Sequence, residues 1–404
     1  MKIGIIGGGA AGFFAAINAK ENYPSAKVII YEKSHKVLVK VRISGGGRCN
    51  VTNGCDSIDS LSEGYPRGGK SIKRNFYIFN NKHTIEWFES RGLPLYTQDD
   101  NRVFPKSNNS ESIIDCLMRE IKRLNIEIQL GVKVKSLKPF SGDRLEIILQ
   151  GEPNPQIFDK VIVATGGSPK RDGLLWLEKL NHKIEEPIPS LFTFKIPNDP
   201  IIQMMGLSVE NVFVSIQGTK LKSSGPLLIT HWGMSGPAIL KLSAFGARIL
   251  SEMKYSFKIN VNWAGEKNND IVTELLKSII SEHPNKLMTN QRPYGLPSRL
   301  WMHFLEKIEI PTNKTWIELG KKGLNKLMNL LTNDEYNVKG RTTFREEFVT
   351  CGGVSLQSID MNTMQSKAVK NLYFAGEILD IDGITGGYNF QNAWTTGFIA
   401  GKLE

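Results

Sequence analysis

The sequence lacks long apolar runs and paired cysteines, which excludes two large classes of protein. No uninterrupted run of about 18 apolar residues occurs, so no helix is predicted to span a membrane. The apolar stretch Ile3–Ile6 is short and runs into glycines rather than a cleavage site, so a signal peptide is not expected. Four cysteines are present without a C-x-x-C pair: Cys49, Cys55, Cys116 and Cys351. In a chain of 404 residues this pattern favours reduced thiols and a cytoplasmic protein.

Metal-binding and hydrolytic patterns are also absent from the sequence. The 6 histidines are scattered, no cluster has metal-ligand spacing, and no order of serine, histidine and aspartate points to nucleophilic catalysis. We therefore expect no metal. Positive charge is abundant by contrast, with 51 lysines and arginines, 40 acidic residues and a net charge of +11. This excess favours anionic partners such as dinucleotides, acidic metabolites or nucleic acid, and a role in solubility alone is an equal alternative.

The N-terminus carries a nucleotide-binding pattern. Lys2–Ile6 is predicted to be a short strand, and a G-x-G-x-x-G motif and a helix follow it. In such a motif the first glycine allows a tight turn, the second lets the backbone approach a pyrophosphate, and the third lets the helix pack on the sheet. The helix N-terminus presents free N–H groups to the phosphates. The predicted contacts are Gly7, Gly9, Ala10, Ala11 and Gly12.

A second predicted strand, Lys27–Tyr31, ends at an acid. Glu32 stands 20 residues beyond Gly12, where a carboxylate accepts hydrogen bonds from ribose hydroxyls, and its neighbour Lys33 is placed in the same site. A 2′-phosphate would be repelled there, so NADP is disfavoured. The pattern predicts a bound adenine dinucleotide, but it does not separate FAD from NAD. The alternative is a glycine turn with only a packing role.

A further strand–glycine–helix pattern lies near the C-terminus. Leu372–Ala375 is predicted to be a buried strand that stops at Gly376-Glu377, and Gly386-Gly387 open a helix over Tyr388–Gly401. Strand, glycine and acid resemble the F-A-G-D segment of FAD proteins with the glutathione-reductase type of fold, where the acid binds the ribityl chain. The helix N-terminus can face the N1–C2=O edge of the flavin and stabilise its anionic reduced form. The alternative is one more strand–helix unit of the sheet.

With these segments the chain resembles the BaiN/YhiN-like flavoproteins, described as aminoacetone-oxidase-like or NAD(P)/FAD-dependent oxidoreductases. The resemblance rests on the N-terminal glycines and on SGGGRCNVTN (Ser44–Asn53), THWGMSGPAIL (Thr230–Leu240), FVTCGGV (Phe348–Val354) and YFAGEILDIDGITGGYNFQNAWTTG (Tyr373–Gly397). It implies an α/β fold in which a discontinuous Rossmann-like FAD-binding domain is interrupted by a barrel-like β domain and a helical subdomain. The implied boundaries are 1–190 and 339–404 for the FAD-binding domain, 191–265 for the barrel-like domain and 266–338 for the helical subdomain.

Periodicity and turn residues predict the elements between the two glycine patterns. Residues 54–80 are polar and glycine-containing and are expected to form a loop region. Helices are expected at Ser110–Leu124, Ile271–His283, Pro297–Lys307 and Thr315–Leu331. Strands are expected at Glu127–Val134, Leu145–Leu149, Lys160–Ala164, Phe192–Ile196, Val209–Gln217 and Phe257–Trp263. From Val338 the chain is expected to return to the FAD-binding domain.

Other glycine-rich and polar segments are predicted to line the rest of the flavin. A flavin dinucleotide is much longer than its phosphates, so the loop at residues 43–53 can return along it. Arg48 can offset the pyrophosphate charge, and Asn50 and Asn53 can bond the ribityl chain or the ring edge. The full set of expected contacts beyond the N-terminal unit is Ser44, Gly45, Gly46, Gly47, Arg48, Cys49, Asn50, Asn53, Val134, Thr165, Gly166, Gly167, Gly352, Gly353, Gly376, Glu377, Asp380, Gly386, Gly387, Tyr388 and Asn389.

The protein needs to supply little beyond position, electrostatics and one acid, because the flavin carries the hydride step. The candidate catalytic residues are Cys49, Cys351, His231 and Tyr388. A thiol near a flavin can donate a proton, but we favour each cysteine as a small residue of the site wall. His231 lies in a segment that the resemblance places near the site, and a structural hydrogen bond within the insert is an equal alternative. Tyr388 follows a glycine pair and can supply a hydrogen bond to the ring.

These patterns predict an FAD-dependent oxidoreductase that moves a hydride between flavin N5 and a carbon atom. We favour reduction of an activated C=C bond in a small-molecule substrate. One alternative is reduction of uridine to dihydrouridine in ribosomal RNA, which the net charge of +11 would suit. Another is a non-catalytic flavin redox sensor or binding module. No second G-x-G-x-x-G is present, so NADH or NADPH is expected only as a transient electron donor.

Overall fold

Two compact units make up the structure. The computed structural model describes residues 1–152, 154–342 and 349–404. One unit comprises Met1–Ser190 and Phe344–Glu404, and the other comprises Leu191–Thr343. The first unit is therefore discontinuous in sequence, and the second is inserted into it. Helices accompany several sheets, as the expected α/β class requires.

The first unit is built on a 7-stranded sheet with the order β20-β21-β22-β10-β1-β2-β6. Its strands are β1 (Lys2–Ile6), β2 (Lys27–Glu32), β6 (Glu127–Leu130), β10 (Lys160–Val163), β20 (Ile359–Asp360), β21 (Gln365–Ser366) and β22 (Leu372–Phe374). The strands from β22 to β6 pair in parallel, with β1 between β10 and β2. The valines and isoleucines of β1, β2 and β10 suit this position, because a parallel sheet is covered on both faces.

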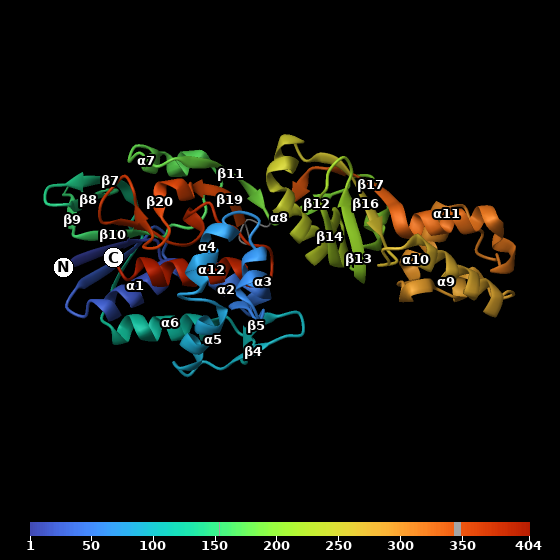
Figure 1. Ribbon diagram of the computed structural model, residues 1–404, viewed down its shortest axis with the longest axis horizontal. Coiled ribbons are helices and arrows are strands. Elements are labelled where there is room, and N and C mark those ends of the chain that lie inside the picture. Colours follow the sequence, from blue (N-terminus) through green and yellow to red (C-terminus); the bar gives the residue numbers. More distant parts are fainter. Residues whose placement is uncertain (153, 343–348) are drawn as a thin grey trace. The chain divides into compact units, whose positions relative to one another are not determined.

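Helices from opposite ends of the chain cover this sheet together. Helix α1 (Ala10–Asn22) and helix α12 (Tyr388–Ala400) lie side by side (Figure 1). The contact is close because one partner is glycine: a Cβ at Gly397 would lie 2.9 Å from the carbonyl oxygen of Ala11. Both helices are buried along most of their length, so the N-terminal and C-terminal parts of the first unit share one hydrophobic core.

Several of the remaining helices of the first unit were not expected from the sequence. The helices are α2 (Val39–Gly47), α3 (Ile58–Glu63), α4 (Gly69–Phe76), α5 (Asn81–Glu89), α6 (Glu111–Arg123) and α7 (Leu175–Glu178). The smaller sheets contain β3 (Thr52–Asn53), β4 (Leu95–Thr97), β5 (Arg102–Pro105), β7 (Val134–Phe140), β8 (Arg144–Leu149), β9 (Gln156–Phe158), β11 (Ile184–Ser190) and β19 (Val349–Val354). The expected loop over residues 54–80 is wrong, because α3 and α4 fill much of it. Ser57 caps α3 by accepting a hydrogen bond from Ser60 N at 3.1 Å, and α4 buries Ile72 and Phe76 among polar residues.

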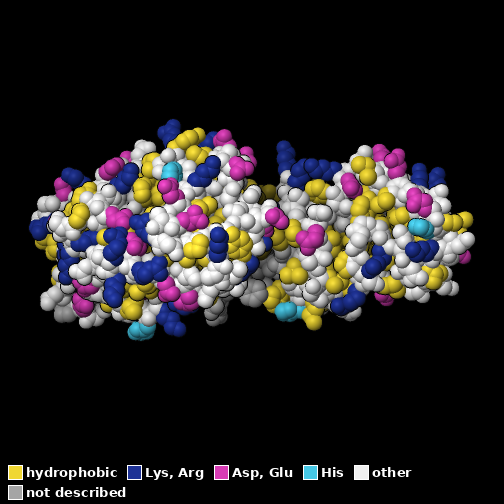
Figure 2. Space-filling view, turned by 90° about the horizontal axis from the view of Figure 1, so that it is seen from below, with side chains coloured by type: hydrophobic (Ala, Val, Ile, Leu, Met, Phe, Trp, Pro, Cys, Tyr) yellow, Lys and Arg dark blue, Asp and Glu magenta, His cyan; other side chains and the backbone are white. Residues whose placement is uncertain are grey.

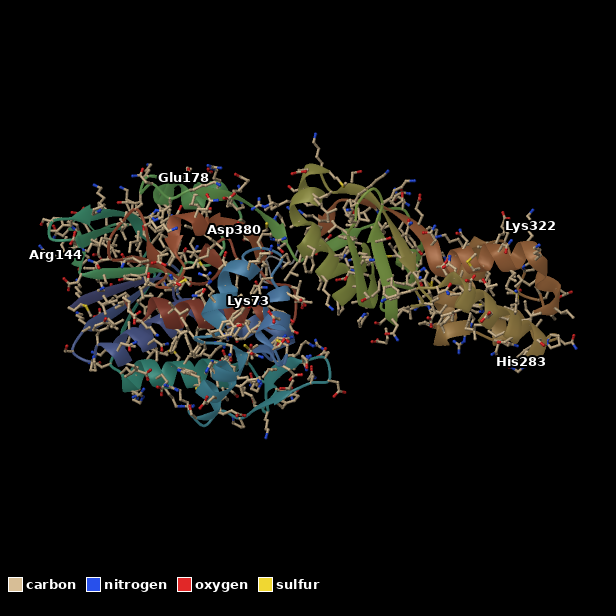
Figure 3. All side chains as sticks on the ribbon, viewed as in Figure 1. Lys73, Arg144, Glu178, His283, Lys322 and Asp380 are labelled. Carbon is tan, nitrogen blue, oxygen red and sulfur yellow. The ribbon has the colours of Figure 1, made fainter. Side chains whose placement is uncertain are left out.

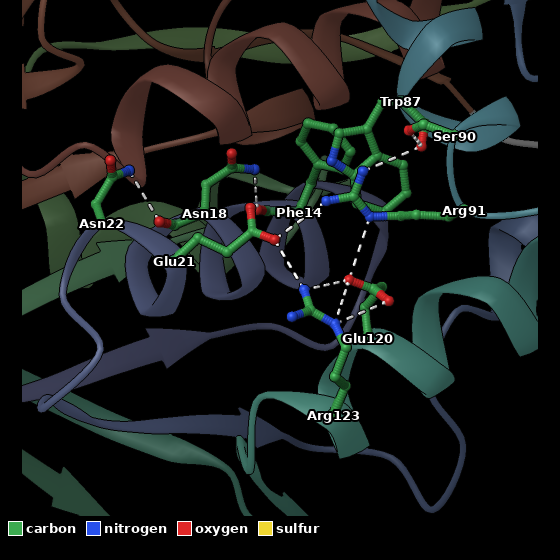
Figure 4. Close-up of polar contacts among 9 residues, drawn as sticks. All are labelled: Phe14, Asn18, Glu21, Asn22, Trp87, Ser90, Arg91, Glu120 and Arg123. Atoms are coloured by element: carbon green, nitrogen blue, oxygen red, sulfur yellow. Dashed lines mark hydrogen bonds and ion pairs between the residues drawn. The ribbon is translucent and has the colours of Figure 1, made fainter.

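An ionic network ties α1 to the segments that follow α5 and end α6 (Figure 4). Arg91 lies 3.1 Å from the carboxylate of Glu21, and Arg123 lies 2.6 Å from that of Glu120. Each arginine also contacts the other acid, and the Arg91 guanidinium stacks 4.0 Å from the ring centroid of Trp87. Burial alone would raise the pKa of Glu120, but the two arginines outweigh it and lower that pKa.

The second unit contains another 7-stranded sheet, with the order β17-β16-β13-β14-β15-β12-β18. Its strands are β12 (Thr193–Lys195), β13 (Ser208–Ile216), β14 (Lys222–Thr230), β15 (Gly233–Ser235), β16 (Ser256–Asn262), β17 (Asp334–Lys339) and β18 (Arg341–Thr342). β17 and β18 stand at opposite ends of this order, yet only Gly340 separates them in sequence. The two ends of the strand order therefore lie close together at this turn. The chain stays in this sheet beyond Val338, where its return was expected, because β17 pairs with β16 as far as Lys339.

Helices pack on this sheet within one core. They are α8 (Pro237–Glu252), α9 (Asn269–Glu282), α10 (Ser298–Lys307) and α11 (Gly320–Asn333). Periodicity missed β14, because Gly225 and Pro226 interrupt its alternation. Among the helices in the described ranges, none has both the length and the apolar character that a membrane crossing needs.

We predict that Glu120→Gln lowers the free energy of unfolding by about 2 kcal/mol near neutral pH, because it removes charge-assisted hydrogen bonds. The folded-state pKa of Glu120 is lowered, so its stabilisation is present above the unfolded-state pKa of about 4.3 and is lost as pH falls through the folded-state pKa. Urea unfolding at neutral and acidic pH should therefore show the difference from wild type shrinking on acidification. Exposed Glu86 on α5 provides the control, and Glu86→Gln should change stability by less than about 0.5 kcal/mol. A loss that is equal at every pH would contradict the network.

Candidate functional site

The loops that carry the expected contacts meet at one edge of the first sheet. Strands β1, β2, β10 and β22 are parallel, so their carboxyl ends share that edge. Gly7 follows β1, Glu32 ends β2, Thr165 comes shortly after β10, and Gly376 comes shortly after β22. The strand order also reverses between β1 and β10, and ligands of open α/β sheets bind at the carboxyl edge beside such a reversal.

The N-terminal glycines divide into two that pack and one that is open. Gly7 has a φ of 115°, and a Cβ there would overlap the carbonyl oxygen of Ala164. A Cβ at Gly12 would overlap the carbonyl oxygen of Gly7, so the start of α1 lies against the turn itself. By contrast, a Cβ at Gly9 would meet no atom within 4 Å, and no side chain caps α1. This leaves open backbone and free N–H groups where a pyrophosphate needs them.

Glu32 is held beside the glycine turn by backbone donors. Its Oε2 accepts a hydrogen bond from Gly8 N at 2.7 Å, and its Oε1 accepts one from Ser34 N at 2.8 Å. Oε1 also accepts a hydrogen bond from Ser34 Oγ at 2.9 Å, so Oε2 is the oxygen that retains a lone pair for a ribose hydroxyl. Lys33 beside it is exposed, and Val134 is half-buried at the start of β7. The ribose contact itself stays a prediction.

The second glycine loop is tightly wound and contains an unsatisfied polar atom. Helix α2 loses its helical backbone at Ser44, and the next three glycines all have positive φ. A Cβ at Gly46 or Gly47 would meet no atom within 4 Å. Asn50 is buried, and its Oδ1 has no hydrogen-bond partner among the residues that the structure describes. Such an atom is costly to bury, and a donor on a bound cofactor would satisfy it.

Cys49 and Arg48 lie in the same loop. Burial raises the pKa of Cys49 to about 12, with a hydrogen bond involving Ser44 acting against the rise. The thiol is therefore protonated at neutral pH and is a poor nucleophile. The Arg48 guanidinium lies 4.2 Å from the ring centroid of Phe104, and its Nε donates to Gly45 O at 3.3 Å. Its expected contact with a pyrophosphate stays a prediction.

Glu377 joins four segments of the site. Its Oε1 accepts a hydrogen bond from Thr350 N at 3.0 Å, and its Oε2 lies 2.6 Å from Lys40 Nζ. A Cβ at Gly167 would lie 2.6 Å from Glu377 Oε1, so the T-G-G loop needs glycine where it passes the carboxylate. Gly166 in that loop is open, whereas a Cβ at Gly376 would lie 2.7 Å from Ala11 Cβ.

Sequence reasoning missed Lys40 and Thr350. Thr350 Oγ1 is buried without a hydrogen-bond partner among the described residues, as Asn50 Oδ1 is. Two signals were available, since Lys40 belongs to a dense basic stretch and Thr350 to the FVTCGGV motif. Neither signal identifies Glu377 as the shared partner, because Lys40 lies 337 residues and Thr350 lies 27 residues from Glu377 in the chain.

Strand β19 packs through its two glycines. A Cβ at Gly352 would overlap the carbonyl oxygen of Glu186, and one at Gly353 would overlap that of Ile378. Close packing therefore accounts for glycine at both positions. Cys351, directly before the two glycines in the chain, is fully buried. Phe348, which begins the motif, lies outside the described residues.

A buried ion pair joins the segment before α4 to the C-terminal loop, and it was not expected as a unit. Arg67 Nε donates to Asp382 Oδ1 at 2.6 Å, and a second guanidinium nitrogen bonds Asp382 Oδ2. Ser190 Oγ donates to Asp382 Oδ2 at 2.7 Å. Asp380 is labelled in Figure 3, and its N–H donates to Val354 O at 3.0 Å. Arg67 begins the basic stretch RGGKSIKR, but only the fold shows that its charge faces inward.

The N-terminus of α12 is fixed to the second glycine loop. Asn53 Nδ2 donates to Gly386 O at 3.1 Å. A Cβ at Gly387 would overlap the backbone of Thr52. Asn389 makes two hydrogen bonds to the backbone of Gly383, at 2.9 Å each, so its amide is used within the protein. No side chain caps α12, which leaves its first N–H groups free.

Tyr388 is the first residue of α12. Its ring lies against Gly64, where any Cβ would overlap it, and edge-on to Tyr65 at 5.7 Å between centroids. Burial raises the pKa of Tyr388 to about 12. The phenol is therefore protonated at neutral pH and is a hydrogen-bond donor.

His231 belongs to the second unit and is not among the residues that the first unit brings together. It is exposed between β14 and β15, and its ring centroid lies 3.9 Å from that of Trp232. No group of three or more histidine, cysteine, aspartate or glutamate side chains in the described part of the chain is arranged to hold a metal ion.

Open glycines, free helix N-termini and the unpartnered oxygens of Asn50 and Thr350 fit a bound FAD along this edge of the sheet. The fold and the site thus define a dinucleotide-binding flavoprotein. The profile of the HI0933-like protein Rossmann domain matches residues 1–403, and the chain belongs to this family of FAD-dependent oxidoreductases. The resemblance stated from the motifs is therefore confirmed.

Curated relatives match the chain over nearly its whole length. A 3-dehydro-bile acid delta(4,6)-reductase of Clostridium scindens is 28% identical over 99% of this chain and 98% of its own. A ribosomal RNA dihydrouridine synthase of Escherichia coli is 28% identical over 98% of this chain and 96% of its own. A ribosomal RNA dihydrouridine synthase of Haemophilus influenzae is 26% identical over 98% of this chain and 96% of its own.

Solved structures share the fold at low identity. A 3-ketosteroid delta1-dehydrogenase of Sterolibacterium denitrificans has a TM-score of 0.53 and 12% identity, over 99% of this chain and 98% of its own. A 3-ketosteroid-delta4-(5alpha)-dehydrogenase of Rhodococcus jostii has a TM-score of 0.50 and 12% identity, over 100% of this chain and 96% of its own. These likenesses show the architecture alone.

We predict that Gly9→Ala and Gly12→Ala separate cofactor binding from folding. A methyl at Gly12 overlaps the Gly7 carbonyl, so Gly12→Ala should destabilise the protein by about 3 kcal/mol. A methyl at Gly9 meets no protein atom and should leave the stability of the FAD-free protein close to wild type. The same methyl would occupy space for the pyrophosphate, so Kd for FAD should rise at least about tenfold. Thermal unfolding without FAD and titration with FAD measure the two effects. Wild-type FAD affinity in Gly9→Ala would show that the cofactor lies elsewhere.

Proposed function

We propose that this protein reduces a C=C bond conjugated to a carbonyl group, with FAD as the hydride carrier. One observation carries the proposal. Relatives matched over at least 96% of their own length bear names that describe this chemistry on two unlike substrates, a bile acid and uridine in ribosomal RNA. Saturation of the uracil C5=C6 bond and of a steroid C=C bond is the same reaction, so the shared scaffold supports the reaction more strongly than either substrate.

The reaction places defined demands on the protein. A hydride adds to the β-carbon, negative charge develops on the carbonyl oxygen, and a proton adds to the α-carbon. FAD supplies the hydride in its reduced form when bound. The free N–H groups at the start of α12 place a positive dipole end beside Gly386 and Gly387, where negative charge would be stabilised. Glu377 and Lys40 would bind or orient the hydroxyl-rich part of the cofactor.

Tyr388 is our candidate for the donor to the carbonyl oxygen. It stands at the α12 N-terminus, and its phenol remains protonated because burial raises its pKa to about 12. Cys49 is less suited to donate to the carbonyl oxygen. Its pKa is also about 12, but its thiol is completely buried. In this proposal Cys49 lines the wall, and Cys351 packs β19.

Ribosomal RNA is the second candidate substrate. The net charge of +11 favours a polyanion, and two of the three relatives described above are named for activity on ribosomal RNA. A small carbonyl compound needs no such charge. NADH or NADPH as transient electron donor and a cytoplasmic location remain part of the proposal.

Anaerobic reduction followed by reoxidation tests the reaction. The reduced flavin should be reoxidised rapidly by a conjugated enone, and the product should lack the C=C bond. Nucleosides from the ribosomal RNA of cells with and without the protein, scored for dihydrouridine by mass spectrometry, then separate the two substrates. An unchanged dihydrouridine content would exclude the RNA form. Slow reoxidation by both enone and RNA would overturn the proposal in favour of a redox sensor.

We predict that Tyr388→Phe lowers kcat/KM by about 100-fold while FAD content stays at the wild-type level. Burial favours the neutral phenol of Tyr388, so the phenol should keep its proton until the pH approaches 12. The wild-type kcat/KM should therefore not decrease through deprotonation of Tyr388 below that pH. Steady-state assays across pH test both statements. Tyr77→Phe, at a tyrosine with 69% exposure, provides the matched control and should leave kcat/KM unchanged. An unaltered kcat/KM in Tyr388→Phe would remove this residue from the mechanism.

A further inference from the structure

Excess positive charge is concentrated in the second unit. Residues 191–343 contain 19 lysines and arginines and 12 acids, a net charge of +7, whereas the rest of the chain contains 32 and 28, a net charge of +4. On the face that Figure 2 shows, basic and acidic side chains are interspersed over each unit. An anionic partner of the second unit must therefore be recognised at a local group of cations rather than by a uniform field.

Three segments of the second unit bring four basic residues together around Gly340. Lys195 ends β12, and its N–H donates to Gly340 O at 3.1 Å. Gly340 N donates to Tyr255 O at 2.7 Å, which places Lys254 and Tyr255 on the same corner. Lys339 and Arg341 flank Gly340 in the chain. We call Lys195, Lys254, Lys339 and Arg341 the Gly340 corner.

An aromatic ring lies within the Gly340 corner. The Arg341 guanidinium lies 4.7 Å from the ring centroid of Tyr255. The Tyr255 ring is in turn held edge-on against Phe192, with 5.4 Å between centroids. A planar cation stacked on a half-buried tyrosine, surrounded by lysines, combines the two elements that bind nucleic-acid backbones and bases.

No acidic side chain in the described part of the chain is paired with the Gly340 corner. None of its four side chains forms an ion pair within residues 1–152, 154–342 and 349–404. Elsewhere in the unit lysines are paired, as Lys258 is with Glu335 at 2.6 Å. Glu252, exposed at the end of α8, is the acid closest in sequence to Lys254, and no ion pair joins them. The three lysines of the corner are exposed, and a Cβ built on Gly340 would meet no atom outside its chain neighbours closer than the Lys195 side chain, at 3.8 Å.

We propose that the Gly340 corner binds the phosphate backbone of an RNA substrate. The proposal rests on the RNA form of the proposed function and adds the surface that holds the polyanion. Lys195 and Arg341 also stand close in sequence to Leu191 and Thr343, where the chain enters and leaves the second unit. Lysine and arginine here position the backbone of the RNA and carry no base specificity.

Salt-dependent binding of ribosomal RNA transcribed in vitro tests the proposal. The test protein is the FAD-loaded full chain carrying Lys195→Gln, Lys254→Gln, Lys339→Gln and Arg341→Gln. Each phosphate contact contributes about 0.7 to 0.9 to the slope of log K against log salt concentration, so the four changes should reduce the slope by about 3. Affinity near 50 mM salt should fall at least about tenfold, while FAD content and turnover of a small enone stay at wild-type levels.

A variant with the same change of charge elsewhere in the unit provides the control. Lys277, Lys321, Lys322 and Lys326 are exposed on α9 and α11, and Lys322 lies at the helical end of the second unit (Figure 3). Their replacement by glutamine should leave the slope within about 1 of wild type. A second control keeps the charge of the Gly340 corner by replacing its three lysines with arginine and Arg341 with lysine. This variant should retain the wild-type slope of log K against log salt concentration.

The outcomes separate the two proposals. No RNA binding by wild type at low salt overturns the RNA form of the proposed function, and the corner proposal with it. Binding with an unchanged slope in the corner variant, or an equal loss in the control variant, overturns the corner alone. If the four changes together lower the FAD content, the pair Lys195→Gln and Lys254→Gln, both at exposed side chains, should still reduce the slope by about 1.5.

Discussion

The close approach of two backbone turns at the carboxyl edge of the first sheet is the constraint on which the site depends. Gly7 lies against the Ala164 carbonyl where the strand order reverses, and Gly12 lies against Gly7. Any Cβ at these positions would force β1, β10 and α1 apart. Because β1, β10 and α1 are held together, Gly9 and the N-terminus of α1 remain open. The same glycine turn therefore provides both the close packing and the access for a ligand.

Contacts between distant segments then assemble the rest of the edge. Glu377 links β19, the T-G-G loop and Lys40, and Asn53 links the second glycine loop to the start of α12. The buried ion pair of Arg67 and Asp382 joins the segment before α4 to the loop that precedes α12. The charges of Arg67 and Asp382 are costly to bury alone, so their pairing specifies how the N-terminal and C-terminal parts of the unit fit together.

Much of the architecture was predictable, because the local sequence patterns agree with the burial of the same residues in the tertiary structure. The strands at Lys2–Ile6 and Leu372–Phe374 and the helix at Glu111–Arg123 follow from apolar runs and periodicity. Prediction failed where few apolar residues carry an element, as in α3 and α4, or where Gly225 and Pro226 interrupt a strand. The sequence predicts that these glycines are needed, yet only the tertiary structure separates open Gly9 and Gly46 from Gly352 and Gly353, which pack against carbonyl groups.

By itself the sequence determined the class of the protein, a flavoprotein. A dinucleotide-binding motif after the first strand and a matching C-terminal segment indicate that a flavin binds between them. These signals are local, and they can be interpreted directly from the steric properties of glycine and the free N–H groups of helix N-termini. Only the tertiary structure decided which polar groups are left without partners, that Cys49 is a buried thiol, and that Arg67 faces Asp382. The reason is physical, because burial and pairing depend on contacts between residues hundreds of positions apart, and no local pattern encodes them.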